Sequence, residues 1–113
     1  MGSRMSISGK LPLEVRQAIS QLGDNIRLAR QRRRMSQDDV AKACQVTRKT
    51  VYSLEKGDPG TSLGTAFSVV WALGLLSSAQ ALANPDLDEH GKILDAARQP
   101  KRVRQPAPAD TDF

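Results

Sequence analysis

Hydrophobic residues recur at spacings of three and four along most of the chain, and no strand-like alternation appears between residues 12 and 83. These spacings are those of one face of an α-helix. The first such series predicts an amphipathic helix from Leu13 to about Arg33. Gly23-Asp24 is a candidate interruption, because a glycine inside a helix costs about 1 kcal/mol relative to alanine. The pattern predicts an all-α protein.

Two shorter helices are predicted within residues 37–56, on either side of a break at Gln45. Ser36 is a favourable N-cap for the first, with Asp39 at the capping-box position. Thr47 is the expected cap of the second, and Gly57 is its expected C-terminal stop. The inward face of the second helix is predicted to consist of Val51, Leu54 and Glu55. The two helices are therefore expected to be joined by a tight turn.

Two cations, Arg48 and Lys49, occupy the first turn of that second helix. The helix dipole disfavours a cation at this end by up to about 1 kcal/mol. A local rule that is broken without structural gain indicates a functional site. Phosphates and base edges are the natural partners of such a helix start. The arrangement is that of a helix-turn-helix, with residues 47–56 as the helix that enters the major groove.

The string IRLARQRRRMSQDDVAKACQVTRKTVYSLEKG resembles the Cro/CI-type (XRE) helix-turn-helix regulators, and the resemblance spans residues 22–75. It implies a five-helix, lambda-repressor-like DNA-binding domain. It also implies that Gln37 opens the second helix and contacts DNA, and that a buried pair of Arg30 and Glu55 links the first and third helices. The family usually has glycine in the turn where this chain has Gln45, and positive φ is uncommon for a non-glycine residue.

The resemblance further implies base-edge contacts from the start and middle of the third helix, at Arg48, Lys49 and Ser53. Arg33 is a candidate phosphate contact, whereas Arg32 and Arg34 fit equally well as solvated cations at a helix C-terminus. The predicted DNA-binding set is Gln37, Thr47, Arg48, Lys49, Tyr52, Ser53, Lys56 and Arg33.

Further helices are predicted after the turn at 58–60. Ser62 or Thr61 caps one that ends at Gly74, and Ser77 begins a capping box for a short helix to about Ala83. The expected buried side of the first comprises Leu63, Ala66, Phe67, Val70, Trp71 and Leu73. The predicted organisation is a disordered start (1–11), a DNA-binding domain (12–83), an accessory helix (84–98) with a thin apolar stripe of Leu87, Leu94 and Ala97, and a basic, Pro-rich disordered tail (99–113).

The composition indicates the charge of the expected partner and argues against a catalytic or metal site. The net charge of +5 favours polyanionic partners. Cys44 is the only cysteine and His90 the only histidine, and they fall in different predicted elements, so neither a zinc site nor a catalytic pair is expected. We expect no enzyme activity, no cofactor, no membrane span and a reducing, cytoplasmic location, with association to the nucleoid through the operator. Met1–Met5 is typical of a vector remnant before a native Met5.

The predicted function is repression of transcription by a homodimer on a palindromic, double-stranded DNA operator with half-sites about 34 Å apart. The stretch NPDLDEHGKILDAARQPKRVR resembles the tail of HipB-like antitoxins, which implies a HipA-like kinase toxin as partner. Two alternatives stay open: a stand-alone phage-type or metabolic repressor without a toxin, and an adaptor that uses the motif for protein contacts. The tail cations Lys101, Arg102 and Arg104 fit a solvated tail, a DNA arm or a partner-binding segment.

Overall fold

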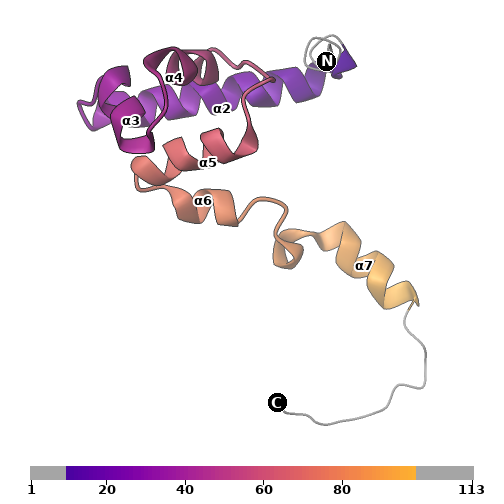
Figure 1. Ribbon diagram of the computed structural model, residues 1–113. Helices are drawn as coiled ribbons and strands as arrows, with labels where there is room; N and C mark the ends of the chain where they lie inside the picture. The colour runs from indigo at the N-terminus through magenta and orange to yellow at the C-terminus, as the bar shows by residue number, and fades with distance from the viewer. Residues whose placement is uncertain (1–9, 99–113) are drawn as a thin grey trace. The chain divides into compact units, whose positions relative to one another are not determined.

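The helices of the chain follow one another with short connections in the computed structural model, which describes residues 10–98. The elements are α2 (Leu13–Arg32), α3 (Gln37–Cys44), α4 (Arg48–Glu55), α5 (Leu63–Ala72), α6 (Leu76–Gln80), the 3-10 helix η1 (Pro85–Leu87) and α7 (Glu89–Arg98) (Figure 1). The predicted all-α class, five helices followed by an extra C-terminal one, is confirmed for this part of the chain. The predicted disorder of residues 1–9 and of the 99–113 tail lies outside the described residues.

The chain divides into two compact units between Ala79 and Gln80. The first unit contains α2 to α5 and most of α6, and it includes the helix-turn-helix. The second contains η1 and α7. Within residues 10–98, no helix combines the length and the apolar character that a membrane crossing requires.

The core of the first unit lies where α3, α4 and α5 meet, with α2 packed on α4 (Figure 1). At its centre are three completely buried valines, one from each of these three helices: Val40, Val51 and Val69. Burying a side chain of this size stabilises a fold by about 1.5–3 kcal/mol. The surrounding buried residues are Ile26, Ala29, Ala41, Leu54, Ala66 and Leu73. This core holds α4 by its inner face.

The predicted interruption at Gly23-Asp24 was wrong, because α2 runs unbroken through it. Gly23 is buried, and a Cβ built on it would lie 2.5 Å from the carbonyl oxygen of Glu55 and 2.8 Å from that of Leu54. Both distances are far below van der Waals contact. The missing side chain therefore allows the C-terminal end of α4 to approach α2 closely, and this packing outweighs the intrinsic cost of a glycine in a helix.

The predicted caps of the two short helices are confirmed. The Ser36 hydroxyl accepts from the Asp39 backbone N–H and the Asp39 carboxylate accepts from the Ser36 N–H, which completes the capping box. Thr47 Oγ1 accepts from the Thr50 N–H at 3.2 Å. Gln45 adopts the left-handed conformation (φ 58°), so the turn keeps the shape that glycine normally provides. A left-handed non-glycine residue costs about 1–2 kcal/mol, which the packing of α3 and α4 must offset.

The predicted buried side of α5 was partly wrong. Val69, which was not predicted, is completely buried, whereas Leu63 and Trp71 are 68% and 58% exposed. Ala66 and Leu73 face the core with Val69, at helical spacing. Val70 is partly buried against the core. Three further apolar residues, Leu63, Phe67 and Trp71, recur every four residues on a second face. Because α5 is apolar on both faces, periodicity alone could not tell which one packs inward.

The capping box predicted at Ser77 was also wrong. Helix α6 begins at Leu76 and ends at Gln80, so Ser77 lies inside it. Ala83 then takes a positive φ of 58° and closes the segment before Asn84.

The accessory helix predicted for residues 84–98 is divided in the second unit. Asn84 Oδ1 accepts from the Asp86 N–H at 2.9 Å and caps η1, and Asp88 Oδ1 accepts from the Gly91 N–H at 2.9 Å at the start of α7. Two adjacent caps therefore start two separate elements. The predicted apolar stripe is exposed, with Leu87 at 70% and Leu94 at 47%.

Candidate nucleic-acid interface

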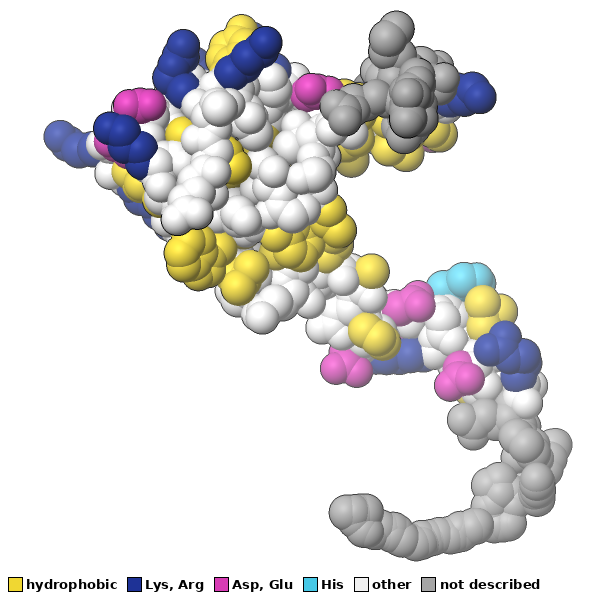
Figure 2. Space-filling model, in the orientation of Figure 1, with side chains coloured by type: hydrophobic (Ala, Val, Ile, Leu, Met, Phe, Trp, Pro, Cys, Tyr) yellow, Lys and Arg dark blue, Asp and Glu magenta, His cyan; other side chains and the backbone are white. Residues whose placement is uncertain are grey.

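The outer face of α4 is the most distinctive polar surface of the first unit. Arg48, Lys49, Tyr52 and Lys56 are exposed and Ser53 is half-buried, while Val51, Leu54 and Glu55 on the opposite face are buried. Figure 2 shows Lys and Arg side chains gathered over α4 and over the end of the unit where α2 gives way to α3. The predicted DNA-binding residues of α4 therefore lie together on one face.

The start of α4 carries no acidic residue in its first turn, and Arg48 and Lys49 occupy that turn. Its neighbour α3 has Asp38 and Asp39 at the same place. The positive end of the α4 dipole is therefore reinforced by two cations instead of being neutralised. Such a helix end attracts anions.

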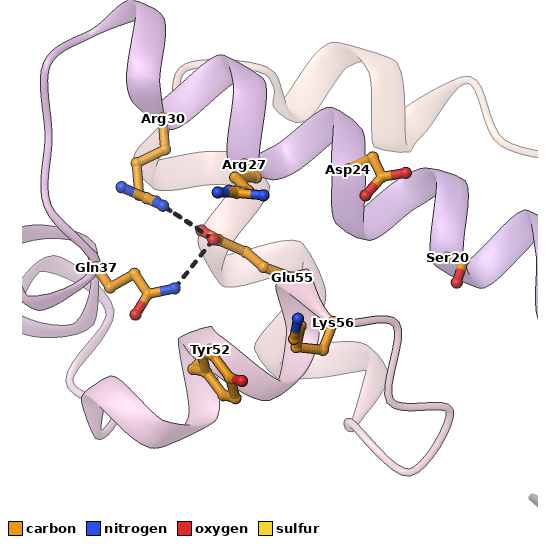
Figure 3. A pocket seen from close by; sticks show the side chains of 8 residues that line it. All are labelled: Ser20, Asp24, Arg27, Arg30, Gln37, Tyr52, Glu55 and Lys56. Carbon is orange, nitrogen blue, oxygen red and sulfur yellow. Dashed lines mark hydrogen bonds and ion pairs between the residues drawn. The ribbon is translucent and has the colours of Figure 1, made fainter.

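Beneath this face, Arg30 of α2 and Glu55 of α4 form a bidentate ion pair (Figure 3). Arg30 Nε donates to Glu55 Oε2 at 2.6 Å, and Arg30 Nη2 donates to Oε1 at 3.0 Å. The side chains are 11% and 3% exposed. The hydrogen bond to Glu55 raises the pKa of Arg30 against the opposing effect of burial. A third N–H of Arg30 donates to the Met35 carbonyl at 2.9 Å and ties the pair to the chain just before α3.

Gln37, at the start of α3, connects this pair to the surface. Its Nε2 donates to Glu55 Oε1 at 3.1 Å, and its Oε1 accepts from Arg48 Nη1 at 3.5 Å. The structure therefore brings the predicted ion pair and two predicted DNA contacts into one network. Residue spacing alone could not reveal it, because Gln37 and Glu55 are 18 positions apart.

A polar cavity of about 330 Å³ lies beside the network, between α2 and α4 (Figure 3). Its walls are formed by Ser20, Asp24, Arg27, Arg30, Gln37, Tyr52, Glu55 and Lys56. Lys56 Nζ lies 5.7 Å from the centre of the Tyr52 ring, within the range of a cation–π contact. The sequence analysis did not predict that Arg27 lies at this site. Its position three residues before Arg30 could have indicated it, because residues at this spacing share one face of a helix.

A second polar hollow, of about 320 Å³, adjoins the other side of α4. Lys49 and Ser53 line it together with hydroxyl groups from the loop before α5 and its first turn: Thr61, Ser62 and Thr65. The sequence analysis assigned these three residues no DNA contact. Their signal was the cluster of Ser and Thr directly after the Asp-Pro-Gly turn.

The structure places Arg33 differently from the other predicted contacts. Its Nη1 donates to the Ala29 carbonyl at 2.8 Å, so the side chain caps the C-terminal end of α2. Arg34 takes a positive φ of 54° where α2 ends. Arg33 therefore stabilises the helix terminus in the unbound protein, and a phosphate would compete with the Ala29 carbonyl for it.

Cys44 belongs to α3 in the first unit, and His90 belongs to α7 in the second. The Cys44 thiol donates to the Ser68 carbonyl at 3.3 Å, and burial raises its pKa. Across residues 10–98, no group of three or more His, Cys, Asp or Glu side chains could hold a metal ion.

Comparison with known protein families accounts for this geometry. The sequence model of a family described as a helix-turn-helix domain matches residues 21–80, which include all of α3, α4 and α5. Neither the curated proteins nor the solved structures gave a significant match. The family match supports a DNA-binding regulator, in agreement with the two cations at the start of α4. The chain belongs to the helix-turn-helix domain family.

Proposed function

We propose that the protein is a sequence-specific regulator of the Cro/CI (XRE) type that represses transcription as a homodimer on a palindromic operator. The observation that carries the proposal is the two-sided character of α4. Its inner face packs on α2 and α3, and its outer face exposes two cations in the first turn. DNA supplies the anions that such a helix start attracts. A motif used only for protein contacts would have no need of this electrostatically unfavourable arrangement.

The roles in the complex follow from position on α4. Arg48, Lys49 and Ser53 contact base edges in the major groove, because they lie at the start and middle of the exposed face. Thr47, Tyr52 and Lys56, with Arg33 directly after α2, contact the flanking sugar-phosphate backbone and set the register of the helix.

The exposed face of α5 supports the homodimer. Leu63 and Trp71 leave most of their apolar surface in water, and Figure 2 shows hydrophobic side chains gathered over α5 and α6. A two-fold interface on this surface would place two α4 helices on half-sites about 34 Å apart, one turn of the duplex. Repression then follows from covering a promoter.

Selection from a randomised duplex library tests the function directly. The full-length protein should enrich one palindromic sequence. Arg48→Ala should lower affinity for that sequence by about 5- to 150-fold, the loss expected for one bidentate base contact, with little change on random DNA. Arg16→Ala, an exposed arginine near the start of α2, is the control and should change neither. Failure to enrich any sequence would refute the function, and equal losses on both duplexes would make Arg48 a phosphate contact.

Sedimentation of two variants tests the homodimer. Trp71 and Leu13 are 58% and 57% exposed, so they form a matched pair. Trp71→Ser should shift a micromolar sample from dimer to monomer and remove cooperative binding to the palindrome, whereas Leu13→Ser should not. A parent that sediments as a monomer would refute the dimer.

A second candidate function is that of a HipB-like antitoxin, and the second unit favours it. Leu87, Ile93 and Leu94 expose 70%, 66% and 47% of their surface there, which gives η1 and α7 an apolar surface for a partner. If a kinase-like toxin is encoded beside this gene, Ile93→Ser should weaken its binding while operator affinity stays unchanged. Full toxin binding by Ile93→Ser would leave the stand-alone repressor as the better reading.

A further inference from the structure

We propose that Glu55, which is buried and cannot touch DNA, determines the base that α4 prefers. It fixes the amide of Gln37, which in turn directs Arg48 toward guanine. Glu55 and Gln37 are then positioning residues, and Arg48 is the residue that reads the base. This inference rests on the proposed function, since it requires that α4 enters the major groove.

The orientation of the Gln37 amide is determined by the charges on its two sides. A carboxylate only accepts hydrogen bonds and a guanidinium only donates them. The amide nitrogen must therefore face Glu55, at 3.1 Å, and the amide oxygen must face Arg48, at 3.5 Å. The flipped amide would place oxygen against carboxylate and N–H against guanidinium. Both contacts would then be repulsive, so only one orientation is stable.

The carboxylate that sets this orientation is itself immobile. Glu55 is 5% exposed and receives two hydrogen bonds from Arg30. Arg30 is anchored in turn on the Met35 carbonyl. A continuous series of hydrogen bonds thus leads from the backbone between α2 and α3 to the exposed guanidinium of Arg48. Each step except the last is half-buried or buried.

This arrangement selects a base by the groups that remain free. Glutamine reads adenine with its amide oxygen and nitrogen together. Here the oxygen accepts from Arg48 and one of the two N–H groups donates to Glu55, so the amide would have to give up these contacts to turn its whole edge onto adenine. Arg48 keeps donors only. Guanine presents two acceptors, O6 and N7, on its major-groove edge, and arginine contacts both at once. The 3.5 Å contact between Arg48 Nη1 and Gln37 Oε1 is long for a hydrogen bond. It therefore orients the Arg48 side chain weakly, and the guanidinium can still adjust its position to the base.

Gln37→Met tests the inference without disturbing the ion pair. Methionine has nearly the shape of glutamine but no polar amide. The bonds between Arg30 and Glu55 therefore remain, while Arg48 loses the amide oxygen that orients it. Gln17→Met, on an exposed glutamine of α2, is the matched control. Each full-length variant is taken through library selection, and fluorescence anisotropy then compares four duplexes that differ only at the position whose preference Arg48→Ala abolishes. Glu55→Gln joins the set if its circular dichroism shows a folded domain.

The parent and Gln17→Met should prefer guanine over the other three bases by about 5- to 150-fold. Gln37→Met and Glu55→Gln should reduce this preference to below about threefold. A full guanine preference in Gln37→Met would overturn the inference and leave the proposed function intact. An adenine preference that Gln37→Met abolishes would also overturn it, because Gln37 would then read the base itself. A parent that enriches no sequence removes the function and the inference together.

Discussion

Replacing Glu55 with alanine removes the acceptor of three hydrogen bonds, two from Arg30 and one from Gln37. The guanidinium of Arg30 would keep only its bond to the Met35 carbonyl. Since the Arg30 side chain is 11% exposed, water can replace the lost carboxylate only in part. The variant therefore leaves a largely buried cation without its counter-charge.

Breaking a buried ion pair by removing one partner costs about 3–5 kcal/mol. A small domain has a free energy of unfolding of about 5–15 kcal/mol, so this loss is a large share of the total. For a domain of 60–100 residues, 1 kcal/mol corresponds to about 4–8 °C in Tm. We therefore expect Glu55→Ala to lower Tm by about 12–40 °C.

Thermal and urea unfolding, followed by circular dichroism at 222 nm, measures this loss. Arg32→Ala is the control, because Arg32 is exposed, lies two residues after Arg30 on α2, and should change stability by less than about 1 kcal/mol. The double variant Arg30→Met, Glu55→Leu should recover most of the stability, since a buried pair can often be replaced by apolar residues at little cost. A loss below about 1 kcal/mol in Glu55→Ala would refute the reasoning, because that is the magnitude of an exposed pair.

Three further predictions concern other positions. Gly23→Ala should destabilise the fold by about 1–3 kcal/mol, because its Cβ would meet the backbone of α4; Gly64→Ala, with nothing within 4 Å of its Cβ, should be neutral or stabilise by up to about 1 kcal/mol, and equal effects would contradict the packing argument. Hydrogen bonds from Ser36 lower the pKa of Asp39 in the folded protein. The ionised Asp39 side chain therefore contributes fully to the stability of the fold above its unfolded pKa of about 3.9, and this contribution is lost as pH falls through the folded pKa. The Tm difference between the parent and Asp39→Asn should therefore shrink in acid, and a constant difference would exclude a role for this charge. The raised pKa of Cys44 means less thiolate at a given pH, so iodoacetamide should alkylate the folded protein at pH 8 more slowly than the urea-unfolded chain.

Local rules were sufficient for the helix-turn-helix itself. Ser36, Asp39 and Thr47 cap helices through contacts within three residues, so their roles are readable from sequence. The inner face of α4 was also predictable, because its outer face is strongly polar and leaves only one side to bury. The left-handed Gln45 was recognisable from the resemblance alone, since its side chain gives no sign of that conformation.

Properties that depend on how helices meet were not predictable. Gly23 has the sequence signature of a weak point in a helix, and only the approach of α4 shows that it is a contact. Helix α5 has apolar residues on two faces, so the burial of Val69 and the exposure of Trp71 required the packed structure. The contact between Gln37 and Glu55 joins two helices across 18 residues, and no local pattern encodes it.

The charges of α4 explain why its fold and its proposed function are coupled. Helices α3 and α4 have eight residues each, but α3 has two acids in its first turn and a lysine in its last, whereas α4 has cations first and its only acid, Glu55, last. Both ends of α4 thus oppose its dipole. Tertiary contacts must offset that opposition, above all the bond from Arg30 to Glu55 at one end and the burial of Val51 and Leu54 on the inner face. Because α4 is anchored only through its buried inner face, its cationic start stays available for phosphates and bases in the proposed complex. The Glu55 carboxylate that anchors α4 also orients Gln37 beside Arg48.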